Sequence, residues 1–251
     1  MKTIDAQYEI VSHMFLGDAD QNAGHIRGAS VKGALAFWWR AINYAKFLEQ
    51  ANLDHKDALK KMRERECAIF GGPNGQGAFL MTVSDDWGEE KKKTFSAVLT
   101  EAKDTTGIQY FGYGLDKKRT CIKPNSKFIL KLIAKPNVDV SIMNELYQCL
   151  IMLGTLGGLG SRVRRSWGSL NLEELTTNVN SISQEWTVPT DINSYKKLLK
   201  TIVGYTRSVD MSCAPLTAFG KETISKIGLK DFDDGIEALN FVGKELLRYR
   251  G

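Results

Sequence analysis

The sequence predicts an α+β protein with the ferredoxin-like element order βαββαβ, a long insertion and a mainly helical C-terminal extension. Two segments, 4–11 and 169–175, alternate apolar and polar residues with the period of a half-buried strand. Two more, 78–83 and 127–134, have the composition of short buried strands. An amphipathic helix separates the first two strands and another separates the last two. RNA-recognition modules use the same order.

The first strand places Ile4, Ala6, Tyr8 and Ile10 on one face, with acidic and amide side chains on the other. A loop rich in Gly, Asp and Asn follows. Ser30 is a favourable N-cap, which predicts a helix over 31–50.

This first helix carries two neighbouring tryptophans that a rotation of 100° per residue separates. Trp38 falls on the apolar face, which predicts a core position. Trp39 falls on a stripe with Lys32 and Lys46, and Arg40 lies beyond it. Aromatic and cationic side chains on one face suit base stacking and phosphate contact. The alternative is that Trp39 packs under another loop or subunit.

The middle of the chain predicts a charged helix over 54–66, a turn-rich loop over 67–77 and a strand over 78–83. The insertion, residues 84–126, is longer than an ordinary connection and includes a helix candidate at 95–103. Three of its aromatic residues are candidates for base stacking: Tyr110, Phe111 and Tyr113.

The second half of the predicted fold begins with the strand 127–134, which Pro136 ends, and continues with a helix over 141–155. The strand 169–175 completes a domain over residues 1–175. In a βαββαβ fold we expect the first and fourth strands not to pair with each other. Residues 176–251 predict helices near 193–206 and 231–249.

Positive charge is concentrated in two windows. Between Asp20 and Glu49 there are four cations and no acid, and between Glu145 and Glu173 there are three cations and no acid. These seven cations exceed the net charge of the whole chain, which is +5. Such clustering of Lys and Arg side chains is typical of proteins that bind a polyanionic partner. We expect the two windows to approach each other across one surface.

The second window contains the Gly–Arg loop, residues 154–170, with the sequence GTLGGLGSRVRRSWGSL. Glycine lets a ligand approach the backbone, and guanidinium groups bind phosphates. We therefore expect the loop to bind a nucleic-acid backbone; the alternative is a solvated connection between a helix and a strand. Its candidate residues are Gly157, Gly158, Gly160, Ser161, Arg162, Arg164 and Arg165.

Catalytic alternatives are confined to the loop after the first strand. His25 is a possible general acid or base for RNA cleavage, and Asp18 with Asp20 is a possible Mg²⁺ site. A polar loop histidine and Asx-turns are the alternatives that we favour. We expect no cofactor and no metal site, because neither a P-loop nor a GxGxxG motif nor metal-ligand spacing is present.

Compartment and membrane association follow from composition. No apolar run is long enough to span a membrane, and the N-terminal residues lack the apolar region of a signal peptide. The four cysteines are far apart, which favours a reducing cytoplasm.

Three motifs resemble those of the RAMP superfamily of CRISPR proteins, and within it the subunits of Cmr-type (type III-B) effector complexes. They are IRGASVKGALAFWWRA at 26–41, CAIFGG at 67–72 and GGLGSRVRRSWGSL at 157–170. The residues carried over by position are Arg27, Lys32, Trp39, Arg40, Gly157, Gly158, Gly160, Arg162, Arg164 and Arg165.

The resemblance implies a non-enzymatic RNA-binding subunit in antiviral defence, capping the complex near the 3′ part of the guide RNA and contacting target RNA. Its implied partners are guide RNA, target RNA and other Cmr-type subunits, with no small-molecule substrate. Departures are Ala36 where relatives often have Arg, and the Ser166–Trp167 pair after the double Arg. Residues 176–251 stand where relatives usually carry a second ferredoxin-like half, so they are either a helical extension or a reduced second half.

Two other functions stay open from the sequence. One is a ribonuclease of the same superfamily that uses His25 or the two aspartates. The other is a protein-interaction subunit whose basic stripe meets acidic partner surfaces.

Overall fold

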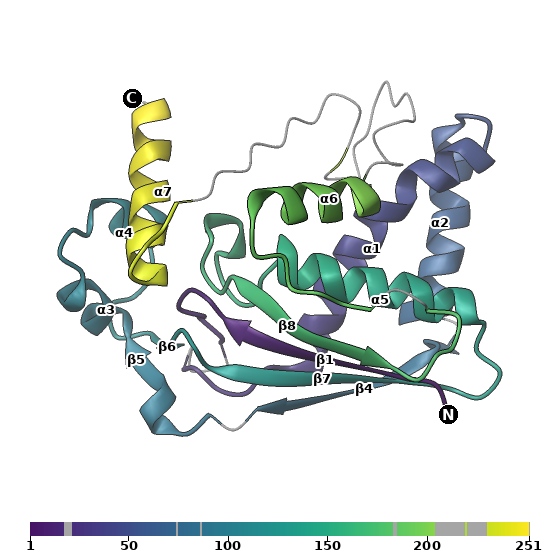
Figure 1. Ribbon diagram of the computed structural model, residues 1–251, viewed down its shortest axis with the longest axis horizontal. Helices are drawn as coiled ribbons and strands as arrows, with labels where there is room; N and C mark the ends of the chain where they lie inside the picture. Colours follow the sequence, from purple (N-terminus) through teal and green to yellow (C-terminus); the bar gives the residue numbers. More distant parts are fainter. Residues whose placement is uncertain are drawn as a thin grey trace.

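The computed structural model describes residues 1–17, 22–73, 75–85, 87–182, 185–203, 219 and 230–250. Its centre is an antiparallel four-stranded sheet in the order β4-β7-β1-β8 (Figure 1). The strands are β1 (Thr3–Ile10), β4 (Phe79–Asp85), β7 (Lys127–Ala134) and β8 (Leu170–Thr177). The mixed α+β class is therefore confirmed.

The pairing of β1 corrects one expectation. Besides pairing with β7, β1 pairs directly with β8, from Ile4 opposite Thr177 to Ile10 opposite Leu170. The first and fourth strands are thus neighbours, and the prediction that they do not pair is wrong. The reason is that the chain leaves β7, crosses the sheet through a helix and returns to the free edge of β1.

The alternation of β1 is confirmed: Ile4, Ala6, Tyr8 and Ile10 are fully buried. The Tyr8 hydroxyl donates to the Leu150 carbonyl oxygen at 2.9 Å, which ties the central strand to a covering helix. An unpartnered buried hydroxyl would cost free energy, so this bond lets a tyrosine occupy a core position.

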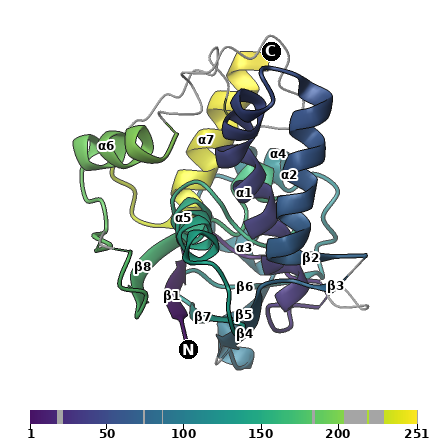
Figure 2. The same cartoon turned by 90° about the vertical axis from the view of Figure 1, so that its right-hand side faces the viewer.

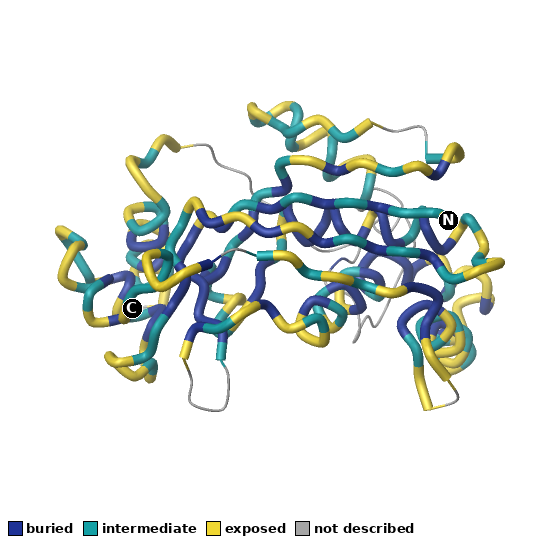
Figure 3. The backbone as a smooth tube through the Cα atoms, turned by 90° about the horizontal axis from the view of Figure 1, so that it is seen from below, coloured by how far each residue is buried: buried dark blue, intermediate teal, exposed yellow. Residues whose placement is uncertain are grey.

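Helices lie on one face of the sheet. Figure 1 and Figure 2 show α1 (Gly28–Gln50) and α5 (Val140–Thr155) on this face, with α6 (Ile192–Val203) beyond α5. No described helix covers the opposite face, seen from below in Figure 3. This open face includes Leu80 of the edge strand β4 and Ile129 of the neighbouring strand β7, which are 57% and 43% exposed.

The start of α1 differs from the expectation. The helix begins at Gly28 with Arg27 in the N-cap position, and no side chain caps it. Ser30 lies in the first turn instead of at the cap. Ser30 therefore does not cap the helix. No side chain at the N-cap position accepts a hydrogen bond from the first backbone N–H groups.

The environment of Trp39 also differs from the expectation, whereas Trp38 packs against the core as expected. Trp39 is fully buried, and its Nε1 donates to the Glu145 Oε2 of α5 at 2.6 Å. Trp38 is only partly buried. The prediction that Trp39 shares an exposed basic face is wrong, because α1 is covered on two sides, by α5 and by α2 (His55–Phe70). Its apolar stripe is therefore wider than one helix–sheet contact requires.

The helix α2 confirms the second predicted helix but continues one turn further. Asp54 caps its start by accepting from the Asp57 N–H at 2.7 Å. The turn ending at Phe70 was expected to be loop. It is helical because Ile69 and Phe70 are buried, with the Phe70 ring packed edge-on against Trp39. The short strands β2 (Gly71–Gly72) and β3 (Gly75–Gln76) follow.

The insertion is ordered throughout most of its length. It contains a short 3-10 turn (Glu89–Lys91), β5 (Lys92–Thr94), α3 (Phe95–Glu101), α4 (Thr106–Phe111) and β6 (Thr120–Ile122). The predicted helix at 95–103 is confirmed as α3. The sequence did not predict α4 or the β5–β6 pair.

The C-terminal helix α7 (Gly235–Arg250) packs on this insertion, not on the main sheet (Figure 1). Gly107 of α4 and Gly243 of α7 lie backbone to backbone, and a Cβ on Gly107 would stand 2.1 Å from the Asn240 carbonyl oxygen. The Asn240 side chain accepts from the Gly107 N–H at 2.7 Å. Both C-terminal helices expected from the sequence are present, although 204–206, the end of the first, lies outside the described residues.

A second hydrophobic core forms where the insertion, α7 and the segment after β1 meet. Its buried members are Phe15, Phe95, Val98, Ile108, Phe111, Cys121, Trp167 and Leu239. Trp167 is fully buried, with its ring 5.0 Å from that of Phe15 and 5.8 Å from that of Phe95. Trp167 therefore anchors the Gly–Arg loop to the insertion.

The buried His13, which follows β1, is a pH-sensitive element. Burial, with a smaller contribution from Lys93, lowers the pKa of His13 from 6.5 to about 4. In the unfolded chain the His13 imidazole therefore becomes protonated as the pH falls below 6.5. In the folded chain it stays neutral until the pH falls to about 4. Its contribution to stability is complete above pH 6.5 and is lost as the pH falls towards 4.

We expect the free energy of unfolding to fall by about 3 kcal/mol over this pH range through His13. Urea unfolding at a series of pH values measures it, with His13→Gln as the control that cannot titrate. Equal pH dependence in the two proteins would contradict the assignment.

Candidate nucleic-acid interface

The two basic windows meet at a cavity of about 780 Å³, which we call the basic cleft. The loop after β1, the start of α1, the Gly–Arg loop and one residue of the insertion line it. Its described lining residues are Phe15, Leu16, Gly17, Gly24, His25, Arg27, Ser30, Ala34, Arg119, Gly158, Leu159, Gly160, Ser161 and Val163. The expected approach of the two windows is confirmed.

The cations of the basic cleft are held by neutral acceptors. Arg27 Nη2 donates to the Gly17 carbonyl oxygen at 2.6 Å. Arg119 Nη2 donates to Ser161 Oγ at 2.6 Å, and its guanidinium lies 5.8 Å from the centre of the Phe15 ring. No Asp or Glu is among the described lining residues. The positive charge therefore faces the cleft without a carboxylate in its described wall.

The excess of positive charge affects the pKa of the Arg119 guanidinium. Partial burial and the neighbouring Arg162 both lower its pKa. Its buried Nε has no hydrogen-bond partner among the described residues. An anion in the cleft would remove both penalties, because it would accept from the guanidinium and offset the repulsion between like charges.

The start of α1 adds to the same potential. Ser30 lies on the cleft wall, and the first turn of this 23-residue helix contains no acidic residue. The N-terminus of a helix carries a partial positive charge from its free N–H groups. Here it reinforces the field of Arg27, which occupies the N-cap position.

The glycines of the Gly–Arg loop also have a packing role that the sequence did not predict, while Gly158 and Gly160 line the cleft. A Cβ on Gly157 would stand 2.7 Å from Trp38 Nε1, and one on Gly158 would stand 2.5 Å from the Gly168 carbonyl oxygen. Gly160 has φ +94° and lies against the Phe15 carbonyl oxygen. The glycines thus allow close packing within the protein.

The arginines of the loop are presented by a strained turn. Arg162 and Ser166 have φ values of 59° and 61°, in the left-handed region that non-glycine residues rarely adopt. Arg164 is exposed and Arg162 half-buried. Arg165 instead donates to the Tyr110 carbonyl oxygen at 3.2 Å, and its guanidinium lies over the Tyr110 ring. Arg165 therefore connects the loop to the insertion.

Other predicted nucleic-acid contacts lie away from the basic cleft. Arg40 forms a 2.5 Å ion pair with Glu66 of α2, and Trp39 is buried as described above. Lys32 is half-buried and Lys46 exposed, and neither is among the described lining residues. The predicted face along α1 is therefore not continuous with the cleft beyond its first turns.

The three aromatic candidates of the insertion have different environments. Phe111 is buried in the second core at 3% exposure, so its assignment as a stacking residue is wrong. Tyr113 is 80% exposed. Tyr110 is half-buried beneath the Arg165 guanidinium.

His25 lies at the edge of the basic cleft. Its side chain is 78% exposed, and Nδ1 contacts the Asp85 Oδ1 at the end of β4 at 2.5 Å. The other Asp85 oxygen accepts from the Ile26 N–H at 3.3 Å, so Asp85 fixes this loop to the sheet. Asp18 and Asp20 lie outside the described residues. Among those described, no three His, Cys, Asp or Glu residues form a metal-binding group.

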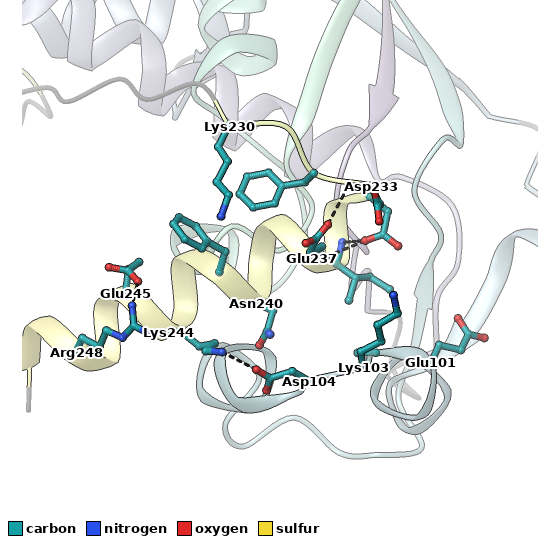
Figure 4. Close-up of a pocket in the computed structure, with 15 residues that line it drawn as sticks. Glu101, Lys103, Asp104, Lys230, Asp233, Glu237, Asn240, Lys244, Glu245 and Arg248 are labelled. Carbon is teal, nitrogen blue, oxygen red and sulfur yellow. Dashed lines mark hydrogen bonds and ion pairs between the residues drawn. The ribbon is translucent and has the colours of Figure 1, made fainter.

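A second cavity, of about 450 Å³, lies between α7 and the insertion (Figure 4). Both acids and cations line it, and two ion pairs form among the described lining residues. Lys244 binds Asp104 at 2.6 Å, and Lys230 stands 3.9 Å from the centre of the Phe241 ring. Because its lining mixes cations with acids, this cavity lacks the uniformly positive lining that the described residues give the basic cleft. Its contacts hold α7 against α4.

Sequence reasoning missed Arg119 and Asp85. Arg119 follows Lys117 and Lys118, a basic run that was visible but that nothing local connects to the first strand. Its place in the cleft depends on distant contacts, such as the antiparallel bridge between Met14 and Ile122.

A family model for the RAMP superfamily matches residues 7–171, from the middle of β1 to the start of β8. The chain belongs to the RAMP superfamily. All the described lining of the basic cleft falls within the matched residues. The resemblance expected from the three motifs is thereby confirmed.

Two similar RAMP proteins come from Pyrococcus furiosus. The CRISPR system Cmr subunit Cmr1-2 is 27% identical over 186 residues, which cover 66% of this chain and 93% of that protein. Cmr subunit Cmr1-1 is 26% identical over 189 residues, which cover 73% of this chain and 51% of that protein. The chain thus matches about half the length of one relative and nearly all of the other.

Solved structures share the fold. The crystal structure of Cmr1 from Pyrococcus furiosus (apo form) aligns with a TM-score of 0.68 and 19% identity, covering 100% of this chain and 74% of that one. A chain in the cryo-EM structure of the type III-B Cmr-beta bound to cognate target RNA aligns with a TM-score of 0.57 and 13% identity. That alignment covers 80% of this chain and 61% of the other.

Within the described residues, none of the helices combines the length and apolar character needed to cross a bilayer.

Proposed function

We propose that this RAMP protein is an RNA-binding structural subunit of a Cmr-type (type III-B) CRISPR effector complex that serves in antiviral defence. The observation that carries the proposal is the basic cleft, where Arg27 and Arg119 meet without a carboxylate in the described wall. Its ligand is a nucleic-acid backbone, bound by charge and therefore largely tolerant of sequence. The similarity to Cmr subunits supports membership of such a complex.

The proposed domain organisation follows the family match. Residues 1–175 form a ferredoxin-like RAMP domain with its insertion at 84–126, and residues 176–251 form a mainly helical extension. The strand order, in which the first strand lies between the third and the fourth, supports this topology. The docking of α7 on the insertion supports an extension, in preference to a reduced second half.

The proposed place in the complex is at its end, near the 3′ part of the guide RNA, where the subunit also contacts the incoming target RNA. Its partners are then guide RNA, target RNA and other Cmr-type subunits. The similar fold of a chain in the type III-B Cmr-beta complex bound to cognate target RNA supports RNA as a partner in such an assembly. Its cellular location is the cytoplasm.

Recovery of RNA with the purified chain tests this function. We expect the absorbance ratio at 260 and 280 nm to exceed that of the protein alone after purification at low salt, and nuclease treatment to lower it. The chain is also expected to join a Cmr-type complex during co-expression. If it joins the complex but binds no RNA in isolation or by cross-linking within the complex, it is a protein-interaction subunit instead.

Ribonuclease activity is the second candidate, favoured by the contact between His25 and Asp85 at the edge of the cleft. A carboxylate can orient a histidine for proton transfer. Incubation of the chain with labelled single-stranded RNA, with and without EDTA, separates the two functions. The proposed structural role predicts intact RNA in both cases. Cleavage that disappears in His25→Ala, or in Asp18→Ala/Asp20→Ala, would establish the enzyme.

A further inference from the structure

We propose that Arg119, which neither basic window contains, anchors one phosphate of a single-stranded RNA inside the basic cleft. The inference rests on the proposed function and deepens it. The insertion then becomes the third wall of the binding site, and the cleft holds one nucleotide unit next to the anchored phosphate.

The position of Arg119 is fixed before any ligand arrives. Its carbonyl oxygen accepts from the Phe95 N–H at 2.9 Å, and its own N–H donates to the Asp116 carbonyl oxygen at 3.1 Å. The side chain lies over Phe15 and donates one N–H to Ser161. A guanidinium has five N–H donors in a fork that matches a phosphate, so donors remain available.

The neighbours of Arg119 define an anion site. Arg27 binds the carbonyl oxygen of Gly17, and a Cβ on Gly17 would stand 3.3 Å from Arg119 Nη2, so both guanidiniums approach this residue. Arg162 is close enough to lower the pKa of Arg119. Two cations thus lie in the wall of the cleft, one from the loop after β1 and one from the insertion, and Arg162 of the Gly–Arg loop lies near the second of them.

The remaining walls favour a nucleotide over a bare phosphate. Val163, which is 38% exposed, supplies apolar surface beside the cations, and the buried Leu16 and Leu159 support the wall from behind. The volume of about 780 Å³ is in the range of pockets that enclose small organic ligands. A base turned out of a single strand can occupy such a pocket, whereas the bases of a duplex are stacked and paired.

Fluorescence anisotropy with a labelled single-stranded RNA of about ten nucleotides tests the anchor on the full chain. We expect Arg119→Gln to weaken binding about tenfold and to reduce the salt slope of log K by about 0.7, the value for one phosphate of a single strand. Arg63→Gln, which removes an exposed arginine of α2, is the matched control and stays within twofold of the wild type. A duplex of the same length binds more weakly than the single strand.

The anchor is overturned if folded Arg119→Gln binds RNA as Arg63→Gln does, with an unchanged salt slope. If thermal melting shows that Arg119→Gln is unfolded, Arg119→Lys replaces it. Lysine keeps the charge but lacks the fork, and wild-type affinity in this variant would overturn the proposal. If Arg162→Ala/Arg164→Ala weakens RNA binding but the Arg119 variants do not, the Arg119 anchor is contradicted and the proposed function is retained. Absence of RNA binding by the wild type removes the proposed function with it.

Discussion

Replacing Arg162 and Arg164 together with alanine is expected to weaken single-stranded RNA binding by about a hundredfold at low salt. Each charged hydrogen bond to a phosphate contributes about 1.5 kcal/mol, and two of them correspond to that factor. Arg164 is exposed and Arg162 lies in a left-handed turn beside the cleft. Dissociation constants from anisotropy titrations measure the effect.

The matched control is Lys56→Ala/Lys60→Ala, which removes two exposed cations of α2 and makes the same change in net charge. If the two double variants lose affinity equally, the effect is one of overall charge and the loop has no special role. Arg165 is kept in this design because it holds Tyr110. Adding Arg165→Ala is expected to destabilise the contact with the insertion as well as to weaken binding.

Replacing Trp167 with alanine is expected to lower the free energy of unfolding by about 3–5 kcal/mol, as for other large aromatic residues removed from a core. Trp167 is fully buried between Phe15 and Phe95 and joins the Gly–Arg loop to the insertion. Urea unfolding followed by circular dichroism measures the loss. The variant is also expected to bind RNA more weakly, because the loop loses its anchor.

Trp167→Phe is the informative control for this position. The indole Nε1 is buried and has no partner among the described residues, so phenylalanine keeps most of the packing and removes an unsatisfied N–H. We expect it to lose less than half as much stability as alanine. A loss below about 1 kcal/mol in Trp167→Ala would contradict the role of this residue as the centre of the second core.

The sheet could be predicted because its strands have local signals. The alternation of apolar and polar residues predicted β1, and the apolar segment 127–134 predicted β7. The β5–β6 pair has three residues in each strand and no periodicity of its own. It forms because Lys92 pairs with Ile122 across the insertion, a contact that no short window of sequence contains.

The tryptophan pair shows a limit of helical periodicity. A rotation of 100° per residue separates Trp38 from Trp39 but does not say how many neighbours surround the helix. Since α5 and α2 both contact α1, the stripe that carries Trp39 is buried as well. The hydrogen bond from Trp39 to Glu145 required knowledge of a helix more than a hundred residues away.

The binding site was partly predictable for a similar reason. Clustering of charge without acids identified both basic windows, and these meet in the structure. Arg119 was missed because its position depends on tertiary contacts, including the bond from the Ala23 N–H to the Thr120 hydroxyl. The glycines were found, but their close contacts are with Trp38, Phe15 and Gly168.

The most direct test of RNA binding in the basic cleft is the salt dependence of the affinity of the wild-type chain for single-stranded RNA. Two guanidiniums in the cleft wall, from Arg27 and Arg119, and two of the adjoining Gly–Arg loop, from Arg162 and Arg164, are available to neutralise phosphates. At about 0.7 for each phosphate, the plot of log K against log salt concentration is expected to have a slope of about −3. A flat plot, or affinity that does not change between low and high salt, would contradict RNA binding through these residues.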